Sequence, residues 1–302
     1  MTEIAIRAGT TKARILPGLG FNCYSLTVDG FDYLHQAPDL FPHGSPTHSG
    51  IPILFPWPNR IAHASFEWEG STYRLPMNEE STGASIHGFA AYARWRVLNQ
   101  QPDEVTAEFV LSKDAPAHAG AWPADAGIRV TYQVEPKRLV VTSVVFAADH
   151  EPLPYGLGFH PYLRVPGECD QWQLQCDATR AWTLDNMIPT GELTPVPPAL
   201  DFTQARGLGA QHLDDVLTGL PPASALSPRA TLSSWASSVT IASDPGFRDY
   251  VLFTPATRDA VAIEPYTCAT DAVHLQASGI DAGWTVLPGG QQSKSRWQIE
   301  VA

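Results

Sequence analysis

A histidine in an unusual local setting lies near the middle of the sequence, in the stretch 155–162 that reads YGLGFHPY. The two glycines of this stretch allow backbone conformations that other residues resist, and Pro161 fixes φ directly after the histidine. This setting predicts that His160 is presented at a site for proton transfer. A core histidine packed in a Gly/Pro turn is the alternative interpretation.

A glutamate near the C-terminal end of the sequence has the features of a general base. Glu264 follows the apolar run Val261–Ile263 and precedes Pro265, so it is predicted to end a buried strand. A poorly solvated carboxyl group has a raised pKa, which suits it to proton abstraction near neutral pH. An exposed glutamate at a strand end is the alternative interpretation.

A proline-rich segment, GIPILFPWPNRIA at 50–62, supplies groups that suit a sugar. Its three alternating prolines are incompatible with a central strand and favour an extended, turn-rich path. Trp57 offers a flat ring on which the C–H face of a sugar could stack. Asn59 and Arg60 offer directional donors for hydroxyl groups. An edge strand followed by a solvated arginine is the alternative.

Two further segments carry polar side chains in apolar surroundings. His87 precedes Gly88, which permits close backbone approach beside the imidazole, although a structural histidine is the alternative. Asp214 and Asp215 are flanked by apolar residues and could cap a helix or accept hydrogen bonds from substrate hydroxyls. The sequence lacks G-x-S-x-G, a phosphate-binding glycine loop and H-E-x-x-H. The inventory therefore predicts acid–base chemistry with no metal, no cofactor and no covalent nucleophile.

Short alternating segments predict that these residues lie on an all-β scaffold, a large antiparallel β-sandwich. The 27 prolines and 23 glycines are spread along the 302 residues, which suits many short strands and gives no candidate linker. We expect one domain over 1–302, a short helix at 201–205 and surface loops at 189–198 and 220–228. The predicted strands lie at 65–68, 72–75, 105–111, 128–134, 139–146, 239–242, 250–253 and 297–301.

Composition limits the partners and the location. A net charge of −12 argues against nucleic acid and anionic membranes, both of which require clustered Lys and Arg. The N-terminus has no basic region followed by an apolar run, and no apolar stretch reaches the length of a membrane span, so we expect a cytoplasmic protein. The four cysteines form no C-x-x-C pair and are expected to be reduced, although Cys169 and Cys176 could bridge in an oxidising compartment.

Taken together, these motifs resemble the aldose 1-epimerase (galactose mutarotase-like) family. The resemblance covers most of the chain. Its anchors are PILFPWPNRI at 52–61, His-Gly at 87–88, GFHPY at 158–162, DDVL at 214–217, AIEPYT at 262–267 and the closing LPGG at 287–290. It implies a β-sandwich of the supersandwich type with an open sugar cleft on one sheet.

The resemblance also implies roles for individual residues in the interconversion of α and β anomers. Glu264 would be the general base on the C1 hydroxyl and His160 the general acid on the ring oxygen, facing each other across the width of one pyranose ring. His87 would assist by hydrogen bonding, while Arg60 and Asp214 would hold sugar hydroxyls. Asp214 is preferred to Asp215 because the family pattern has an apolar or aromatic residue three positions later, where this chain has Leu217.

Departures from the family pattern bear on the substrate. Phe89 stands where galactose-type members usually have a second glycine, as in bacterial subgroups and hexose-6-phosphate epimerases. The phosphate-handling branch differs from this chain at Ala91 and at the pair Asn59-Arg60, and both differences favour an unphosphorylated aldose as substrate. Two nearby cations, Arg94 and Arg96, keep a hexose-6-phosphate 1-epimerase as an alternative function. A non-catalytic carbohydrate-binding protein is the other alternative. A cupin-like metalloenzyme would need an H-x-H motif, which the sequence lacks. We expect a small sugar as ligand and a monomer or homodimer.

Overall fold

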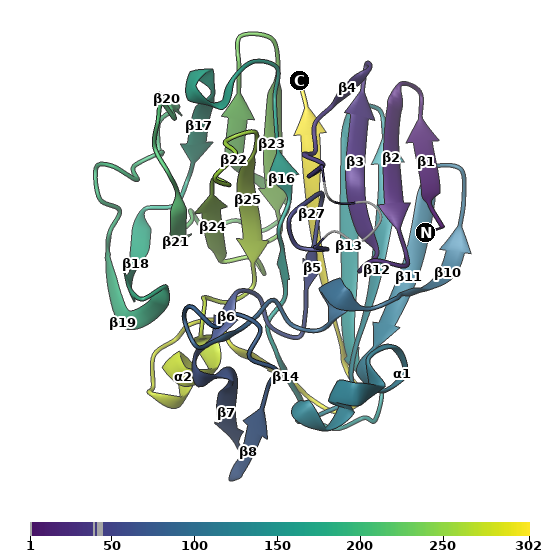
Figure 1. Cartoon of the computed structure of the whole chain (residues 1–302), viewed down its shortest axis with the longest axis vertical. Coiled ribbons are helices and arrows are strands. Elements are labelled where there is room, and N and C mark those ends of the chain that lie inside the picture. Colours follow the sequence, from purple (N-terminus) through teal and green to yellow (C-terminus); the bar gives the residue numbers. More distant parts are fainter. Residues whose placement is uncertain (1, 39, 41–44) are drawn as a thin grey trace.

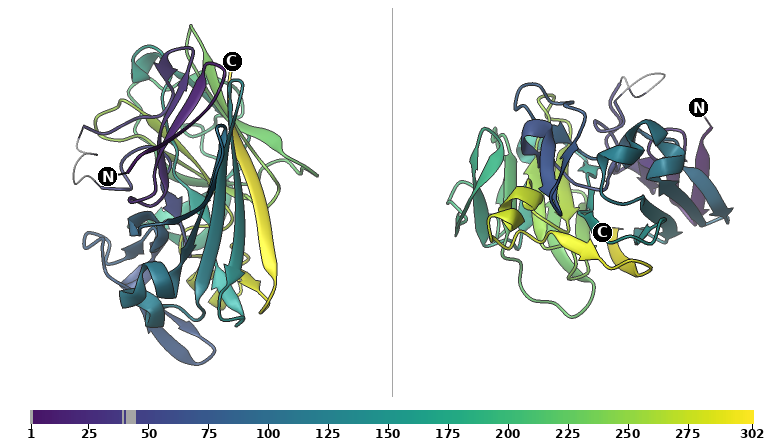
Figure 2. Two further views of the ribbon diagram at one scale, coloured as in Figure 1. Left: turned by 90° about the vertical axis from the view of Figure 1, so that its right-hand side faces the viewer. Right: turned by 90° about the horizontal axis from the view of Figure 1, so that it is seen from below.

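The computed structural model describes residues 2–38, 40 and 45–302. Antiparallel strands dominate this part of the chain, and they form two layers (Figures 1 and 2). A nine-stranded sheet forms one layer. A four-stranded and an eight-stranded sheet pack side by side against it and form the other.

The nine-stranded sheet contains the longest strands. In spatial order it runs through β10 (Arg96–Gln100), β11 (Glu104–Val110), β12 (Ala126–Glu135), β13 (Arg138–Ala147), β27 (Gln292–Val301), β23 (Ser238–Ser243), β22 (Ser227–Ser233), β17 (Gln173–Cys176) and β20 (Arg206–Gly207). The strand latest in the sequence, β27, lies in the middle and joins β13 to β23.

The second layer holds the strands that carry the polar motifs. The eight-stranded sheet comprises β19 (Ile188–Pro195), β18 (Arg180–Asp185), β21 (Asp214–Thr218), β24 (Asp249–Phe253), β25 (Val261–Tyr266), β15 (Gly158–Phe159) and β5 (Ile53–Leu54), with β16 (Tyr162–Leu163) also pairing with β25. The four-stranded sheet comprises β1 (Ile4–Ala8), β2 (Thr11–Leu16), β3 (Asn22–Val28) and β4 (Phe31–Asp32).

Short elements complete the structure. The paired strands are β6 (Arg60–Ile61) with β9 (Ser85–Ile86), β7 (Ser65–Trp68) with β8 (Ser71–Arg74), and β14 (Leu153–Tyr155) with β26 (Thr285–Leu287). The α-helices are α1 (Leu111–Asp114) and α2 (Ala272–Ala277), and the 3₁₀ turns are η1 (Ala62–Ala64), η2 (Ala90–Tyr92), η3 (Pro116–Ala121) and η4 (Cys169–Gln171). Within the described residues, no helix is long and apolar enough to cross a bilayer.

The core lies between the two layers, where alternating side chains of facing strands meet. Ile128, Val130, Tyr132 and Val134 of β12 are all buried, as the alternation in the sequence predicts. Phe159, at the end of β15, packs against Trp297 of β27, with ring centroids 5.1 Å apart. Such contacts join the sheet that carries the polar motifs to the nine-stranded sheet, which makes it a rigid support.

The all-β prediction is confirmed, and so are the hairpin at 65–75 and the strands at 105–111, 128–134 and 139–146. Two local predictions are wrong. Residues 201–205 form no helix, because the carboxylate of Asp201 accepts hydrogen bonds from the backbone N–H and hydroxyl of Thr203 and closes a local turn instead. Residues 189–195 belong to edge strand β19 rather than to a loop. All four cysteines are buried free thiols, so Cys169 and Cys176 form no bridge.

Candidate active site

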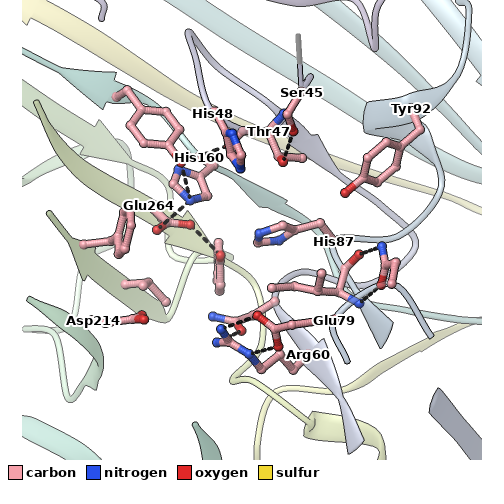
Figure 3. A pocket seen from close by; sticks show the side chains of 17 residues that line it. Ser45, Thr47, His48, Arg60, Glu79, His87, Tyr92, His160, Asp214 and Glu264 are labelled. Atoms are coloured by element: carbon pink, nitrogen blue, oxygen red, sulfur yellow. Dashed lines mark hydrogen bonds and ion pairs between the residues drawn. The ribbon is translucent and has the colours of Figure 1, made fainter. Parts of the chain in front are cut away.

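Strand alternation in the eight-stranded sheet directs a set of polar side chains away from the core. In β25, Ile263 faces the core, whereas Glu264 and Tyr266 point to the opposite face. In the neighbouring β24, Val251 pairs with Glu264 and faces the same way. These residues form the floor of a cavity of about 410 Å³ (Figure 3).

The cavity brings together six of the seven site residues predicted from the sequence, although they come from five separate segments. Its walls include Asn59, Arg60, His87, His160, Asp214 and Glu264. Asp214 opens β21 and lines the cavity, whereas Asp215 is absent from its walls; the contact of Asp214 with a sugar stays a prediction. The alternative that this pair caps a helix is wrong, because both residues lie in a strand.

Trp57 is the exception, and the expectation that it stacks on a sugar is wrong. Its side chain is only 1% exposed and lies outside the cavity. One ring face stacks on Trp122, with centroids 5.1 Å apart, and Phe89 packs edge-on against it. Its indole N–H donates to the carbonyl of Ser85 at 3.2 Å. Trp57 therefore supports the cavity wall from behind.

Glu264 and His160 are in direct contact. The distance from Glu264 Oε1 to His160 Nε2 is 3.2 Å. The predicted separation of one pyranose width is therefore wrong. Chemistry explains the close contact, because the two oxygens that exchange protons, O1 and O5, are both bonded to C1. An acid and a base that serve both atoms need to be neighbours at one edge of the ring.

Burial controls the protonation of this pair. It raises the pKa of Glu264 well above its ordinary value, although the hydrogen bond from Tyr266 opposes the rise. It lowers the pKa of His160 well below its ordinary value, and the nearby His87 adds to this effect. Burial therefore disfavours the charged form of each group and favours a neutral imidazole beside a carboxylic acid, a state that holds one proton.

Two tyrosines hold the pair in place. The hydroxyl of Tyr266 donates to Glu264 Oε2 at 2.5 Å. The ring of Tyr162 stacks on His160 with centroids 4.4 Å apart, and its hydroxyl donates to the carbonyl of Thr47 at 2.9 Å. Both tyrosines lie two residues after the group that they contact, which is the spacing of neighbours on one face of an extended chain.

Arg60 is held by a residue that no sequence motif indicated. Glu79 accepts from Arg60 Nε at 2.6 Å and from one terminal nitrogen at 2.8 Å, a bidentate ion pair. The other terminal nitrogen donates to Asn59 Oδ1 at 3.0 Å. Partial burial would raise the pKa of Glu79, but the hydrogen bonds from Arg60 and Thr82 outweigh it and lower that pKa. Glu79 therefore stays charged and fixes the guanidinium at the cavity wall.

His87 is held at the wall by backbone geometry. It has φ +70° and is followed by Gly88 at φ +67°, where an added Cβ would lie 2.3 Å from the carbonyl oxygen of Phe55. Burial and the charge of Arg60 lower the pKa of His87 to about 3. The imidazole is therefore neutral near pH 7 and serves as a hydrogen-bonding group. Its ring lies 5.6 Å from that of His160.

Three other features belong to the description of the cavity. His48, which precedes the proline-rich segment, lines it, whereas His43 lies outside the described residues. Tyr92, which sequence reasoning missed, is 47% exposed at the rim. Among residues 2–38, 40 and 45–302, no cluster of three or more His, Cys, Asp or Glu side chains could hold a metal ion.

Comparison with known proteins identifies the family and the fold of this chain. The sequence profile of the family described as aldose 1-epimerase matches residues 4–300. The chain therefore belongs to the aldose 1-epimerase family and is a carbohydrate epimerase of the mutarotase type.

Individual relatives agree with this assignment. The uncharacterized protein YihR of Escherichia coli K12 is 30% identical, with 92% of this chain and 87% of the relative covered. A maltose epimerase of Levilactobacillus brevis is 28% identical over 94% of this chain and 89% of its own length. The solved structure of a galactose mutarotase-like protein from Clostridium acetobutylicum has a TM-score of 0.89 at 21% identity, covering 99% of this chain and 95% of that one. The last comparison shows that the fold is shared.

Proposed function

We propose that the chain is an aldose 1-epimerase that opens and recloses the ring of a free aldose, with Glu264 as general base and His160 as general acid. The observation that carries the proposal is their contact at 3.2 Å inside a polar cavity. Rotation about the C1–C2 bond of the open sugar presents the other carbonyl face. Reclosure then gives the opposite anomer, and no cofactor takes part.

One shared proton suffices for the cycle. With His160 protonated and Glu264 ionised, ring opening moves the O1 proton to Glu264 and the His160 proton to O5. The pair ends as a neutral histidine and a carboxylic acid, which again hold one proton between them. Ring closure reverses both transfers. Relative to water, burial favours the distribution with a neutral histidine and a carboxylic acid over the one with two charges.

The remaining cavity groups are proposed to position the sugar. Three of the five N–H groups of Arg60 are occupied by Glu79 and Asn59, which leaves two for sugar hydroxyls. The carboxylate of Asp214 can accept from hydroxyls at the opposite wall. His87, neutral near pH 7, would donate or accept a hydrogen bond near C1 rather than transfer a proton.

The charges around the cavity favour an unphosphorylated aldose over a hexose 6-phosphate. Arg60 is already neutralised by Glu79, and Asp214 and Glu264 add acidic groups to the same walls. Arg96, which left the phosphate reading open, pairs with Asp114 and Glu108 away from this cavity. A phosphate dianion would therefore meet little unpaired positive charge. Anomer exchange of glucose and glucose 6-phosphate tests this point, since a marked preference for the phosphate would overturn it.

Replacing the base tests the assignment. Glu264→Gln should slow anomer interconversion by roughly 10²–10⁴-fold, because Gln keeps the shape of the side chain but accepts no proton. Glu192→Gln on the exposed edge strand β19 is the matched control and should keep full activity. Exchange is followed by polarimetry and by NMR of free aldoses. Full activity in Glu264→Gln would remove the base from the mechanism.

The sequence also gave expectations about domain organisation, ligand, location and oligomeric state. We propose one domain over residues 1–302 and a small sugar as its ligand. A cytoplasmic location and a monomeric or homodimeric state stay predictions, to be checked by cell fractionation and by light scattering.

A further inference from the structure

A cavity of about 320 Å³ lies at the far end of two strands that also reach the active-site cavity. Strand β21 begins at Asp214, in the active-site cavity, and ends at Thr218, which lines the further one. Two arginines, Arg229 and Arg248, also line it, so we call it the arginine cavity. Its volume lies within the range of small-molecule sites, roughly 300–1,000 Å³. The two cavities have no lining residue in common, so the arginine cavity is a separate candidate site.

A β-bulge directs one of the two arginines into this cavity. Along β22, Pro228 pairs with Ala242 and Ala230 pairs with Ile241, so Arg229 is an extra residue with no partner in β23. A bulge of this kind changes the direction of a side chain and is common beside functional sites. The guanidinium reaches the loop at 220–228, where its Nη1 donates to the carbonyl of Pro221 at 2.7 Å.

Arg229 is a buried cation without an ion-pair partner among the described residues. It is only 4% exposed, and its Nε is buried without a hydrogen-bond partner. Arg60, the other deeply buried arginine of the described chain, is 9% exposed and forms a bidentate ion pair with Glu79. Buried charges in proteins are normally paired, because an isolated one is costly. Arg229 therefore lacks the anion that its environment requires.

The acidic side chains nearby do not supply that anion. Burial raises the pKa of Asp177 and the charge of Arg229 opposes the rise, but the two side chains form no ion pair. Asp281 binds Nη1 of Arg248 at 2.8 Å, and the buried Asp249 lies 3.6 Å from its Nε. Arg248 is therefore neutralised within the chain, and of the two arginines Arg229 is the one available to a ligand.

The other walls of the arginine cavity are mainly apolar. They are formed by Leu220, Pro221, Pro222, Ala223, Pro245 and Phe247. A guanidinium binds a carboxylate through parallel N–H groups, and apolar walls favour a hydrocarbon part beside it. A phosphate dianion has no hydrocarbon part, and it would be repelled by the acidic groups that surround Arg248. The lining therefore favours an organic anion with a single charge.

We propose that the arginine cavity binds a small organic monocarboxylate. The carboxylate accepts hydrogen bonds from the terminal N–H groups of Arg229, and the hydrocarbon part packs on Leu220 and the neighbouring prolines. The ligand thus provides the counterion that Arg229 lacks within the chain. No group of the active-site cavity takes part, so the inference does not depend on the proposed function.

Calorimetric titration of the full chain near pH 7, at constant ionic strength, tests the ligand class. The probes are acetate, butyrate, isovalerate and benzoate, with butyramide and benzamide as uncharged counterparts and inorganic phosphate as a purely ionic one. Butyrate or benzoate should bind at least about tenfold more tightly than its own amide and than phosphate, because a hydrogen bond to a charged group is the stronger kind. Equal affinity of acid and amide, tighter binding of phosphate, or no binding of any acid would overturn the inference.

Removing the charge of Arg229 tests its role. Arg229→Met keeps most of the apolar volume and should weaken binding of the best carboxylate by about 10–100-fold, leaving acid and amide equal. Arg74→Met, at an exposed position of β8, removes the same charge elsewhere and should change nothing. Equal weakening in both variants, or in neither, would contradict a carboxylate held by Arg229.

Filling the cavity gives a second test that leaves the buried arginine in place. Ala223 lines the cavity from the loop at 220–228, whereas Ala225 is an exposed residue of the same loop outside the lining. Ala223→Trp should abolish carboxylate binding and Ala225→Trp should keep it. If Arg229→Met does not fold, this pair decides alone: unchanged binding in Ala223→Trp would place the carboxylate elsewhere and refute the site.

Discussion

Replacing Tyr266 by Phe should shift the pH dependence of catalysis without changing the shape of the site. The hydroxyl of Tyr266 donates to Glu264 Oε2 at 2.5 Å, and both residues are fully buried in β25. This hydrogen bond favours the carboxylate over the carboxylic acid and so lowers the pKa of Glu264 against the rise that burial causes. Without it, the pKa of Glu264 rises further.

The expected size follows from the nature of this bond. A hydrogen bond to a charged group contributes about 1.5–3 kcal/mol, and one pKa unit corresponds to about 1.36 kcal/mol. Tyr266→Phe should therefore raise the pKa of Glu264 by roughly one to two units. The acidic limb of the kcat/KM profile should then move to higher pH by the same amount. At pH values below this limb, kcat/KM of the variant should be about 10–100-fold lower than that of the unchanged protein. The difference should disappear as the pH rises and Glu264 ionises.

The measurement is anomer exchange by NMR across pH 5–9, with Tyr250→Phe as control. Tyr250 is also fully buried, on the adjacent β24, and donates to the hydroxyl of Ser243 at 2.8 Å outside the cavity. Both variants lose a buried hydrogen bond, so each should be less stable than the unchanged protein. Only Tyr266→Phe should move the acidic limb. An unmoved limb, or an equal shift in both variants, would refute Glu264 as the titrating base.

Two further predictions concern His87 and Trp57. The pKa of His87 is about 3 in the folded protein, against 6.5 ordinarily. As the pH falls below 6.5, His87 therefore becomes protonated in the unfolded chain but stays neutral in the folded chain, which favours unfolding. In His87→Gln, the loss of unfolding free energy between pH 6.5 and 4.5, measured with urea, should be smaller by up to about 2.7 kcal/mol; an unchanged loss would contradict the buried neutral state. Trp57→Phe removes buried volume and the bond to Ser85, so it should cost about 1–3 kcal/mol of stability in the same urea assay while leaving KM unchanged. A raised KM with unchanged stability would restore Trp57 as a sugar contact.

Regular strands were predictable from sequence because their signal is local. In β12 every second residue from Ile128 to Val134 is apolar, and a Pro136-Lys137 turn separates this strand from β13, which is equally long. The strand at 188–195 was missed because its prolines and polar side chains suit an exposed edge as well as a loop, and only pairing with β18 decides between them. The short helix expected after Asp201 failed because its side chain bonds to the backbone two residues later.

The candidate site was predictable only in part. Glu264 and His160 have recognisable neighbours along the chain, and the partners Tyr266 and Tyr162 follow each at a spacing of two, a signal that could have been used. Glu79 had no such signal. It lies 19 residues after Arg60, and only the fold brings their side chains together.

The central position of β27 has a consequence for how this protein is made. The strands β10–β13 and the group β17, β20, β22 and β23 are two halves of one sheet that touch β27 from either side. While a ribosome is still synthesising the chain, neither half has its partner until Gln292–Val301 has emerged. The nine-stranded sheet is therefore completed only by the last strand, so chaperone binding during translation should matter more for this fold than for one whose strands pair in sequence order.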